Sequence, residues 1–596
     1  MAAFDAIIIG SGAGGAPIAH TLVRAGKSVL ILEKGALLRP QYQTRNGLSD
    51  FKRDEQFSTG AAKRLQIPGL ANTGATYYSS HVEPDLNDEP HVYRDGGGAD
   101  RATVEGYTAQ CVGGGTQLYG AVSLRFTADD FRLATFNSGR TDIRNDPNGD
   151  VLREARDWPV TYEQLEPYYC EAERLVGING SRAGQLKPAS QDHYQTPVAP
   201  NPISQFAADG MDALGMARYR TPLAVITEDH APSGRKKADP RTAFVNRYGD
   251  PLGLKSNTWV SLLSPIANAS NFELRPNCTV TQLEQSHGTV TRVRYRDAGG
   301  AERTVDGRVV VVACSAIESV RLLMLSALRD QDFDRRIYQN ALLGRYFLTH
   351  CFGGAEIRLR SGARTDKVMS LDSDWATDHC ARAEFVRANG MWAGGAIYNN
   401  TSDQALPLAL GRTHGSQDLD TIWDAFINDP ALTGEGLARF LDENLGRRLS
   451  VSFMANQVPL RSNRIALHPF VKDKWGLPSA HIIKDWHSHD VHLMNVLAEQ
   501  CRQVLVAGVP DGDDLSSGHV QMASNAPARI ANHILGGARF GAERADSVLD
   551  PDCRAWDFDN LYVTDGSSMP TSGGANPTLT IQANALRVAD LLKARL

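Results

Sequence analysis

Apolar residues at the start of the chain form two short runs on either side of an amphipathic segment. Residues 4–10 are almost continuously apolar, which is typical of a strand buried on both faces. Ile18, Leu22 and Val23 then recur at helical spacing, and residues 27–32 form the second apolar run. The pattern predicts a strand, a helix and a second strand, which is the repeating unit of a parallel sheet.

Two later segments, residues 308–326 and the last 36 residues, have the same strand-then-helix pattern. Between them, from about residue 344 to 507, shorter segments alternate between apolar and polar positions, which indicates an antiparallel sheet. Three such segments are residues 354–359, 449–454 and 463–467. Residues 490–507 carry apolar side chains at helical spacing and predict an amphipathic helix.

Length and charge restrict the class of protein. At 596 residues the chain exceeds one ordinary domain, so two domains are expected. The formal net charge of −6, without a basic block, argues against a nucleic-acid partner. No apolar run predicts a transmembrane segment. The first residues lack the regions of a secretory signal, so we expect a cytoplasmic protein, or a periplasmic one that is co-exported with a signal-bearing partner.

The cysteines are widely separated, and none has the spacing of a metal or cluster ligand set. We therefore predict no metal site. We expect the thiols to be reduced and buried. They are Cys111, Cys170, Cys278, Cys314, Cys351, Cys380, Cys501 and Cys553.

A glycine-rich turn directly follows the first apolar run. Gly10, Gly12 and Gly15 match the pattern GxGxxG. The first glycine permits a tight turn, the second lets a pyrophosphate approach the backbone, and the third lets helix and strand pack closely. The following helix would offer free N–H groups to the phosphates. Glu33, after the second run, could bind both ribose hydroxyls, which favours FAD or NAD over a cofactor with a 2′-phosphate.

Three further segments favour FAD over NAD, because they resemble segments of a known flavoprotein family. Residues 111–120 read CVGGGTQLYG, residues 309–323 join a valine-rich strand to a small-residue turn, and residues 560–580 contain NLYVTDGSSMP and GGANPTLT. They resemble the flavin-attachment loop, the second signature and the C-terminal flavin segment of the glucose–methanol–choline oxidoreductases, nearest to the cholesterol oxidase and bacterial glucose/gluconate dehydrogenase branches. Smaller similarities extend the resemblance over nearly the whole chain.

The patterns and the resemblance together imply an α/β fold, in which a discontinuous Rossmann-like FAD-binding domain holds an inserted α+β substrate domain built on an antiparallel sheet. We expect residues 1–160 and 221–335 to form the first two FAD-binding segments, separated by a helical or loop excursion at 161–220. Residues 336–515 would form the substrate domain. Residues 516–596 would form the C-terminal FAD-binding segment with the catalytic residues.

The resemblance also implies which residues contact FAD. They are Gly10, Gly12, Ala13, Gly14, Gly15, Glu33, Lys34, Gly114, Gly115, Thr116, Tyr119, Gly120, Val280, Ala313, Asp565, Gly566, Asn576, Pro577 and Thr578. Neither Gln117 nor Leu118 could supply a histidyl link, so FAD is expected to be non-covalent. The bacterial glucose dehydrogenases carry a cysteine cluster for an iron–sulfur centre, whereas residues 252–258 contain no cysteine, so no relay through such a cluster is expected.

Alcohol oxidation needs a base for the hydroxyl proton and a group that orients the hydroxyl. The resemblance implies His533 as the base and Asn576 as the second member of the pair. An imidazole suits the first role because its ordinary pKa of about 6.5 lies near neutral pH. Asn576 has a second interpretation: followed by Pro577 at the start of an apolar-periodic segment, it could be a helix N-cap. His350 and Tyr119 are the next candidates for the base.

We therefore expect an enzyme that oxidises a CH–OH group of a sugar, sterol, polyol or aromatic alcohol, by proton abstraction at His533 and hydride transfer to flavin N5. The electron acceptor would be oxygen, a quinone or a redox protein, and a small partner subunit is possible. Two alternatives stay open. One is a lyase of the same scaffold with a structural FAD, and the other is a non-enzymatic flavoprotein subunit.

Overall fold

The computed structural model describes fourteen stretches of the chain, with gaps between them. They are residues 4–38, 43–44, 48–49, 63–77, 84–103, 106, 109–238, 250, 252–358, 371–400, 435, 448–509, 519–522 and 533–596.

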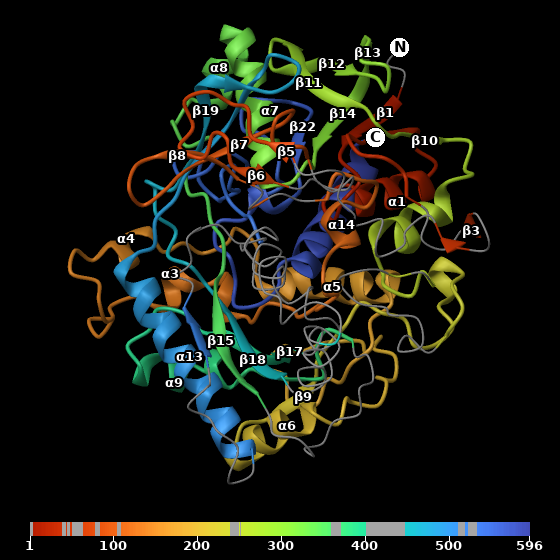
Figure 1. Ribbon diagram of the computed structural model, residues 1–596. Coiled ribbons are helices and arrows are strands. Elements are labelled where there is room, and N and C mark those ends of the chain that lie inside the picture. Colours follow the sequence, from red (N-terminus) through yellow and green to blue (C-terminus); the bar gives the residue numbers. More distant parts are fainter. Residues whose placement is uncertain are drawn as a thin grey trace.

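A five-stranded parallel sheet forms one half of the molecule (Figure 1). Its order is β10 (Phe272–Arg275), β2 (Val29–Leu32), β1 (Phe4–Ile9), β14 (Gly307–Val312) and β22 (Leu561–Val563). From β1 the chain first builds outward through β2 to β10 and then returns to add β14 and β22 on the opposite side. The strand order therefore reverses between β1 and β14, which is where sheets of this kind bind ligands.

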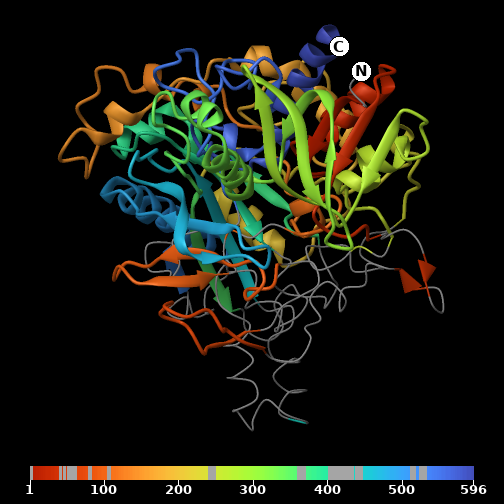
Figure 2. The same ribbon diagram turned by 90° about the horizontal axis from the view of Figure 1, so that it is seen from above.

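Helices complete the three strand–helix units that the sequence predicts. Helix α1 (Ala16–Arg24) joins β1 to β2, α7 (Ala316–Arg329) follows β14, and α14 (Thr578–Arg595) follows β22. Helix α14 packs against both α1 and α5 (Tyr162–Val176). The first and last described segments of the chain thus share one layer, and the start of β1 lies close to the end of α14 (Figures 1 and 2).

A second half of the molecule contains a six-stranded antiparallel sheet. Its order is β21 (His519–Met522), β15 (Cys351–Arg358), β18 (Arg448–Ala455), β17 (Gly395–Asn400), β16 (Trp375–Thr377) and β9 (Arg218–Arg220). The long helix α13 (Ser488–Gly508) packs on β15 and β18, and α6 (Ser204–Ala213) packs on α13 (Figure 1). The predicted α/β fold class with an antiparallel second sheet is confirmed.

One predicted segment belongs to a different sheet. Of the predicted segment 463–467, all residues except the first fall in β19 (Arg464–Lys472). Strand β19 pairs with β20 (Pro478–Ile483) in a separate four-stranded sheet with β7 (His91–Arg94) and β8 (Asp100–Thr103). The pairing of β20 with β7 is parallel. The alternating pattern predicts a strand correctly but contains no information about its partner. Leu359, predicted to end another segment, lies outside the described residues.

The remaining elements are short or peripheral. The antiparallel sheet β11 (Thr279–Ser286), β12 (Thr289–Arg296) and β13 (Glu302–Val305) packs on β14 and α7. The others are α3 (Leu133–Phe136), α4 (Asp150–Glu154), α8 (Gln331–Ile337), α9 (Ala383–Ala388), β3 (Gln43–Thr44), β4 (Leu48–Ser49), β5 (Lys63–Arg64) and β6 (Thr76–Tyr77). The predicted segment boundaries at residues 160, 220, 335 and 515 stay predictions.

Buried thiols are confirmed for most of the cysteines. All eight are free, seven are buried, and Cys314 is half-buried. None of the helices in the described part of the chain combines the length and hydropathy needed to cross a membrane.

Two glycines let α6 and α13 pack with their backbones in contact. A Cβ at Gly210 would lie 1.9 Å from the carbonyl oxygen of Val504. A Cβ at Gly508 would lie 1.9 Å from the carbonyl oxygen of Phe206. The obstacle is backbone in both cases, so a side chain can be accepted only if the helices move apart.

We predict that Gly210→Ala lowers the free energy of unfolding by about 1 kcal/mol, because overpacking a close contact costs roughly 1–3 kcal/mol and the helix-propensity gain of alanine offsets about 1 kcal/mol of that cost. Denaturant unfolding measures the loss. Ala213→Ser, at an exposed position of the same helix, is the control and should stay within about 0.5 kcal/mol of the wild type. Equal stability of Gly210→Ala and the control would contradict this account of the helix contact.

Candidate active site and cofactor cradle

The glycine-rich turn lies at the carboxyl end of β1, beside the point where the strand order reverses. Gly10 has φ +99°, and a Cβ there would lie 2.3 Å from the carbonyl oxygen of Ala313. A Cβ at Gly15 would lie 2.0 Å from the carbonyl oxygen of Gly10. At Gly12, by contrast, the nearest atoms are 4.0 Å away. Gly10 and Gly15 therefore serve backbone packing, and the missing side chain of Gly12 leaves the space that a pyrophosphate needs.

The Glu33 carboxylate organises this turn. It accepts hydrogen bonds from the Ser11 backbone N–H at 3.0 Å, the Ser11 hydroxyl at 2.6 Å and the Gly35 N–H at 2.8 Å. Burial raises the pKa of Glu33, and these three hydrogen bonds oppose the rise. A carboxylate offers about four acceptor positions, so one remains for a ribose hydroxyl. The remaining acceptor position of Glu33 therefore fits a ribose hydroxyl at the adenosine end of a dinucleotide.

Two distant segments close the cradle around the turn. The Gly113 N–H donates to the Ser11 hydroxyl oxygen at 2.9 Å, and a Cβ at Gly114 would lie 3.3 Å from the Cα of Gly12. From the C-terminal segment, the Thr564 hydroxyl donates to the carbonyl oxygen of Gly14 at 2.9 Å. The two segments that resemble flavin-binding ones thus contact the glycine-rich turn directly.

Other residues expected to contact FAD lie around the glycine-rich turn, and they make different kinds of contact. Asp565 is buried and accepts hydrogen bonds from the hydroxyls of Ser319 and Ser567, so it shapes the backbone before Gly566. The Thr116 hydroxyl donates to the Gly113 carbonyl oxygen at 2.6 Å. Gly115 has open space where a Cβ would stand, whereas a Cβ at Gly120 would collide with the Asp372 carboxylate. Ala13 is half-buried in the turn, and Pro577 and Thr578 begin α14.

Three of the residues expected to contact FAD have other contacts or lie in another element. The Lys34 ammonium pairs with the Glu89 carboxylate and lies 3.7 Å from that of Glu318. The Tyr119 hydroxyl donates to the Ser256 carbonyl oxygen at 3.0 Å. Val280 lies half-buried in β11. The protein itself already binds the polar ends of Lys34 and Tyr119.

A backbone pairing brings His350 and His533 together. Leu348 and Leu535 form an antiparallel bridge in which each N–H donates to the other's carbonyl oxygen, at 2.8 and 2.9 Å. In that register His350, two positions after Leu348, lies opposite His533, two positions before Leu535. The rings of His350 and His533 accordingly meet edge to face, with centroids 5.0 Å apart and planes at 82°. His533 is half-buried and His350 is fully buried.

His350 is held neutral. Burial and then the neighbouring His533 keep the pKa of His350 well below its ordinary value, and backbone groups of residues 572, 573 and 575 act weakly in the opposite direction. Neither ring nitrogen makes a well-formed hydrogen bond to the described residues. The pair therefore consists of a neutral, buried imidazole behind a more accessible one.

The prediction that Asn576 caps the last helix is wrong. Helix α14 begins at Thr578, the N-cap position is Pro577, and no side chain bonds to the free N–H groups of the first turn. The buried Oδ1 of Asn576 has no hydrogen-bond partner among the described residues. The sequence Asn-Pro is typical of a cap, but the proline backbone itself occupies the half-helical position here. The carboxamide is thus available to a ligand.

Residues 571–575, which lead into Asn576, are fixed by contacts that the sequence did not indicate. The Gln457 N–H donates to the Ser572 hydroxyl oxygen at 2.9 Å, and the Gln457 side-chain oxygen accepts from the Thr349 N–H at 2.9 Å. The Gly573 N–H donates to the Asn456 side-chain oxygen at 2.7 Å. Residues 456–457 thus hold both the loop before Asn576 and the backbone before His350. No local motif marks them, because their partners lie more than a hundred positions away in sequence.

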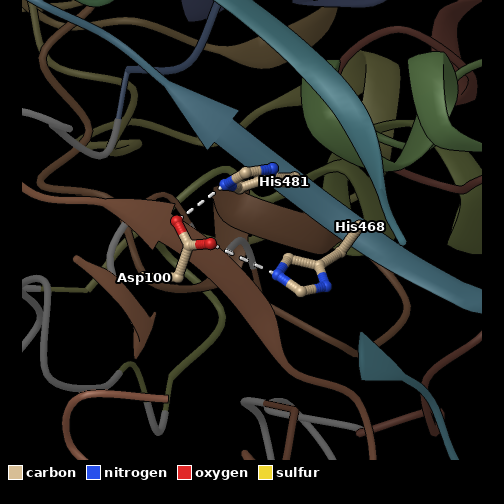
Figure 3. Close-up of side chains that lie close together, drawn as sticks. All are labelled: Asp100, His468 and His481. Atoms are coloured by element: carbon tan, nitrogen blue, oxygen red, sulfur yellow. Dashed lines mark hydrogen bonds and ion pairs between the residues drawn. The ribbon is translucent and has the colours of Figure 1, made fainter. Parts of the chain in front are cut away.

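Among the described residues, two groups of three have the composition of a metal site. In the first, Nε2 of His481 lies 2.9 Å and Nε2 of His468 lies 3.4 Å from the Asp100 carboxylate (Figure 3). However, Nδ1 of His468 accepts from the Val471 N–H at 2.9 Å, so Nε2 carries the proton and offers no lone pair to a metal. Arg94 also binds both carboxylate oxygens, at 3.0 and 3.2 Å. This group is a satisfied hydrogen-bond network.

The second group consists of Asp146, Asp150 and His487. Nδ1 of His487 accepts from the His489 N–H at 3.0 Å, which again places the proton on Nε2. Both groups are therefore poor metal sites, and the absence of a resident metal stays a prediction.

A glycine-rich turn at a topological switch point, with an acidic residue at the next strand end, is typical of a dinucleotide-binding protein. A histidine pair beside the first residue of β15 adds groups that can transfer a proton. Two family models described as GMC oxidoreductase match residues 160–352 and 459–585. The chain belongs to the GMC oxidoreductase family, as its sequence resemblance indicates, and is an FAD-dependent oxidoreductase.

Individual relatives extend this likeness over the whole chain. It is 27% identical to the 2-methyl-1,2-propanediol dehydrogenase of Mycolicibacterium austroafricanum, over 99% of this chain and 95% of that protein. It is 26% identical to the fructose dehydrogenase large subunit of Gluconobacter japonicus, over 99% of this chain and 97% of that protein. Among solved structures, pyridoxine 4-oxidase from Mesorbium loti shares the fold, with a TM-score of 0.56, 15% identity and 99% of both chains covered.

We predict that Glu33→Gln weakens FAD binding about tenfold, because an amide accepts at only one end and a lost hydrogen bond to a charged group is worth on the order of 1.5 kcal/mol. Quenching of flavin fluorescence by apoprotein measures the dissociation constant. Glu273→Gln is the control, since that exposed carboxylate on neighbouring β10 pairs only with Arg275 among the contacts described. An unchanged FAD affinity in Glu33→Gln would remove Glu33 from the cofactor site.

Proposed function

We propose that this protein oxidises a CH–OH group of an alcohol or sugar, with His533 as the base that takes the hydroxyl proton and Asn576 as the group that orients the hydroxyl. The observation that carries the proposal is the edge-to-face pair of His533 and the neutral, buried His350, with residues 572–575 beside it. The names of the two relatives, a propanediol dehydrogenase and a fructose dehydrogenase subunit, support a CH–OH donor.

The two histidines differ in a way that assigns their roles. His533 is half-buried, so a substrate hydroxyl can reach it, whereas His350 is completely buried. A proton taken up by His533 gives its ring a positive charge. The neighbouring His350 ring does not repel this charge, because it stays neutral. His533 is therefore the proton acceptor of the pair, and His350 supports its ring.

Asn576 has no acidic or basic form at neutral pH, so its contribution is directional. The NH2 of its carboxamide can donate to the substrate oxygen while the hydroxyl gives its proton to His533. The Oδ1 of the same carboxamide has no hydrogen-bond partner among the described residues, so the group is not held by the protein through that atom. FAD, when bound, would accept the hydride from the carbon that bears this hydroxyl. The chain's remaining task is to hold FAD, through the turn at residues 10–15 and the Glu33 carboxylate.

The acceptor of the electrons and any further subunit are also proposals. The fructose dehydrogenase relative is named a large subunit, which supports a smaller partner for this chain. Oxygen, a quinone or a redox protein would then reoxidise the flavin. Flavin bleaching on anaerobic addition of alcohols and sugars tests the oxidoreductase reaction, and repeating the panel with oxygen or a dye identifies the acceptor class.

We predict that His533→Ala keeps bound flavin but reduces it about 10²–10⁴-fold more slowly with the best substrate, because this is the usual cost of losing a general base. Asn576→Ala should lose less, since it removes orientation and not a proton acceptor. Because Asn576 caps no helix, its thermal midpoint should match the wild type. Anaerobic stopped-flow reduction measures the rates, and calorimetry measures the midpoints.

His487→Ala, at a histidine outside this site, is the matched control for the reduction rate. A His533→Ala protein that reduces its flavin as fast as the wild type would show that His533 is not the base, and His350 would then be tested next.

We predict that FAD is released by heat or acid precipitation and leaves a yellow supernatant. Residues 113–120 contain no histidine or cysteine, so this loop cannot form a histidyl or cysteinyl link to the flavin. The Gln117 amide donates to the Val112 carbonyl oxygen at 2.9 Å, and the Tyr119 hydroxyl donates to the Ser256 carbonyl oxygen at 3.0 Å. Absorbance of the supernatant and the pellet measures the partition. Flavin that stays with the precipitated protein would contradict non-covalent binding.

A further inference from the structure

A buried chain of hydrogen bonds runs from Asp130 to the loop that precedes Asn576. The Asn456 amide N–H donates to Oδ1 of Asp130 at 2.7 Å, and the Asn456 amide oxygen accepts from the Gly573 N–H at 2.7 Å. Asp130 is 5% exposed and Asn456 is 0% exposed. Water therefore cannot substitute for either partner at low cost.

The chemistry of the two ends dictates the direction of this chain. The backbone N–H of Gly573 can only donate. The other oxygen of Asp130 accepts from the Thr127 N–H at 2.8 Å and from the Thr127 hydroxyl at 2.9 Å, so the carboxylate acts as an acceptor throughout. A side chain that links them must accept at one end and donate at the other, which an amide does.

The loop cannot adjust freely if this link changes. Gly573 has φ +75°, and a Cβ there would lie 2.2 Å from the ring of Phe126, so the backbone already contacts that ring closely. The next residue, Gly574, accepts from the Ala396 N–H of β17 at 2.9 Å. The position of the loop is thus set by its hydrogen bonds to the ends of β17 and β18.

The same strand ends hold the histidine side of the site. Asn456 directly follows Ala455, the last residue of β18, and Ala455 pairs with Cys351 of β15. His350 directly precedes Cys351. A shift of residue 456 relative to its neighbours would therefore change the separation between the Asn576 loop and His350.

We propose that Asp130 and Asn456 are positioning residues that set the place of the Asn576 carboxamide relative to the His350–His533 pair, and through it the orientation of the substrate hydroxyl. The inference rests on the proposed function, in which Asn576 binds the substrate oxygen. Misplacement by about 1 Å from a remote change can cost on the order of 100-fold in rate. Asp130 acts on this loop through the hydrogen bonds of Asn456 to Gly573.

Exchanging the two residues provides a sharp test. Asp130→Asn places two amides in contact, with the oxygen at position 130 facing Thr127 and the NH2 facing Asn456. In its present orientation Asn456 then turns its own NH2 toward that NH2, and in the reversed orientation it turns its NH2 toward the Gly573 N–H, so two donors meet in either case. Asn456→Asp places two carboxylates in contact in a buried site. In the double variant Asp130→Asn/Asn456→Asp, the amide introduced at position 130 still accepts from Thr127 and donates to position 456, where the introduced carboxylate still accepts from Gly573. All hydrogen bonds are restored, and only the donor and acceptor roles between positions 130 and 456 are exchanged.

The measurements are made on flavin-loaded protein well below its thermal midpoint. We expect each single variant to reduce its flavin about 10–100-fold more slowly at saturating substrate, and the double variant to return to within about fivefold of the wild type. The flavin spectrum should stay unchanged and the FAD affinity should change much less than the rate in all three, because Asp130, Asn456 and Gly573 make no hydrogen bond to the turn at residues 10–15 or to Glu33 among the described contacts. Asp129→Asn, at the exposed neighbouring acid, is the control.

A purely structural role would lower the thermal midpoint of the single variants and leave the reduction rate per bound flavin at the wild-type value, which would overturn the proposal. A double variant no faster than the slower single variant would overturn it as well. Thr127→Val removes only one hydrogen bond to Asp130 and serves if the single variants do not fold. It should slow reduction about threefold or more, and an unchanged rate would count against the proposal.

Failure of the proposed function gives a different result. If no alcohol or sugar reduces the wild-type flavin, the proposed function is wrong and the positioning role falls with it. If the wild type is reduced and His533→Ala is slow, while Asp130→Asn equals the wild type, only the positioning role is wrong.

Discussion

Parallel pairing of β14 with both β1 and β22 is the constraint on which the rest of the site depends. Ile9 pairs with Val312, and Val312 pairs with Val563, so three segments from the start, middle and end of the chain finish side by side. Each then turns at once into a segment predicted to bind the cofactor. Because carboxyl ends of parallel strands share one edge, the turn at residues 10–15, Ala313 and Asp565 are brought together by the sheet itself.

Close backbone approach then replaces side-chain contacts at this edge. Gly10 lies against Ala313, Gly14 against Asp565, and Gly15 against Gly10, each at a distance that excludes a Cβ. Such packing explains why these glycines could be predicted from sequence: the steric need is local and recurs wherever a strand turns into a helix beneath a phosphate. Lys34, in contrast, lies in the same stretch but binds Glu89, a partner that no local pattern reveals.

The sequence predicted the elements of the fold better than their associations. The strands and helices around residues 4–32, 308–326 and 561–596 are where periodicity placed them, whereas the order of the strands in the parallel sheet was not predicted. The pattern at 463–467 identified a strand and not its sheet. At Asn576 the local Asn-Pro signal was misleading, because the proline took the capping position. Asp130 and Asn456 gave no signal, since a hydrogen bond across 326 positions leaves no periodic trace.

Backbone hydrogen bonds hold much of the candidate site, and they depend little on the side chains of the residues that make them. His350 and His533 meet because Leu348 and Leu535 exchange main-chain hydrogen bonds, which any two residues with free N–H groups could make. The Asn576 loop is likewise tied to β17 through the N–H of Ala396 and the carbonyl oxygen of Gly574. The side-chain links at Asp130, Asn456 and Gln457 are different, because each depends on a particular donor and acceptor, and a substitution there needs a matching change in its partner.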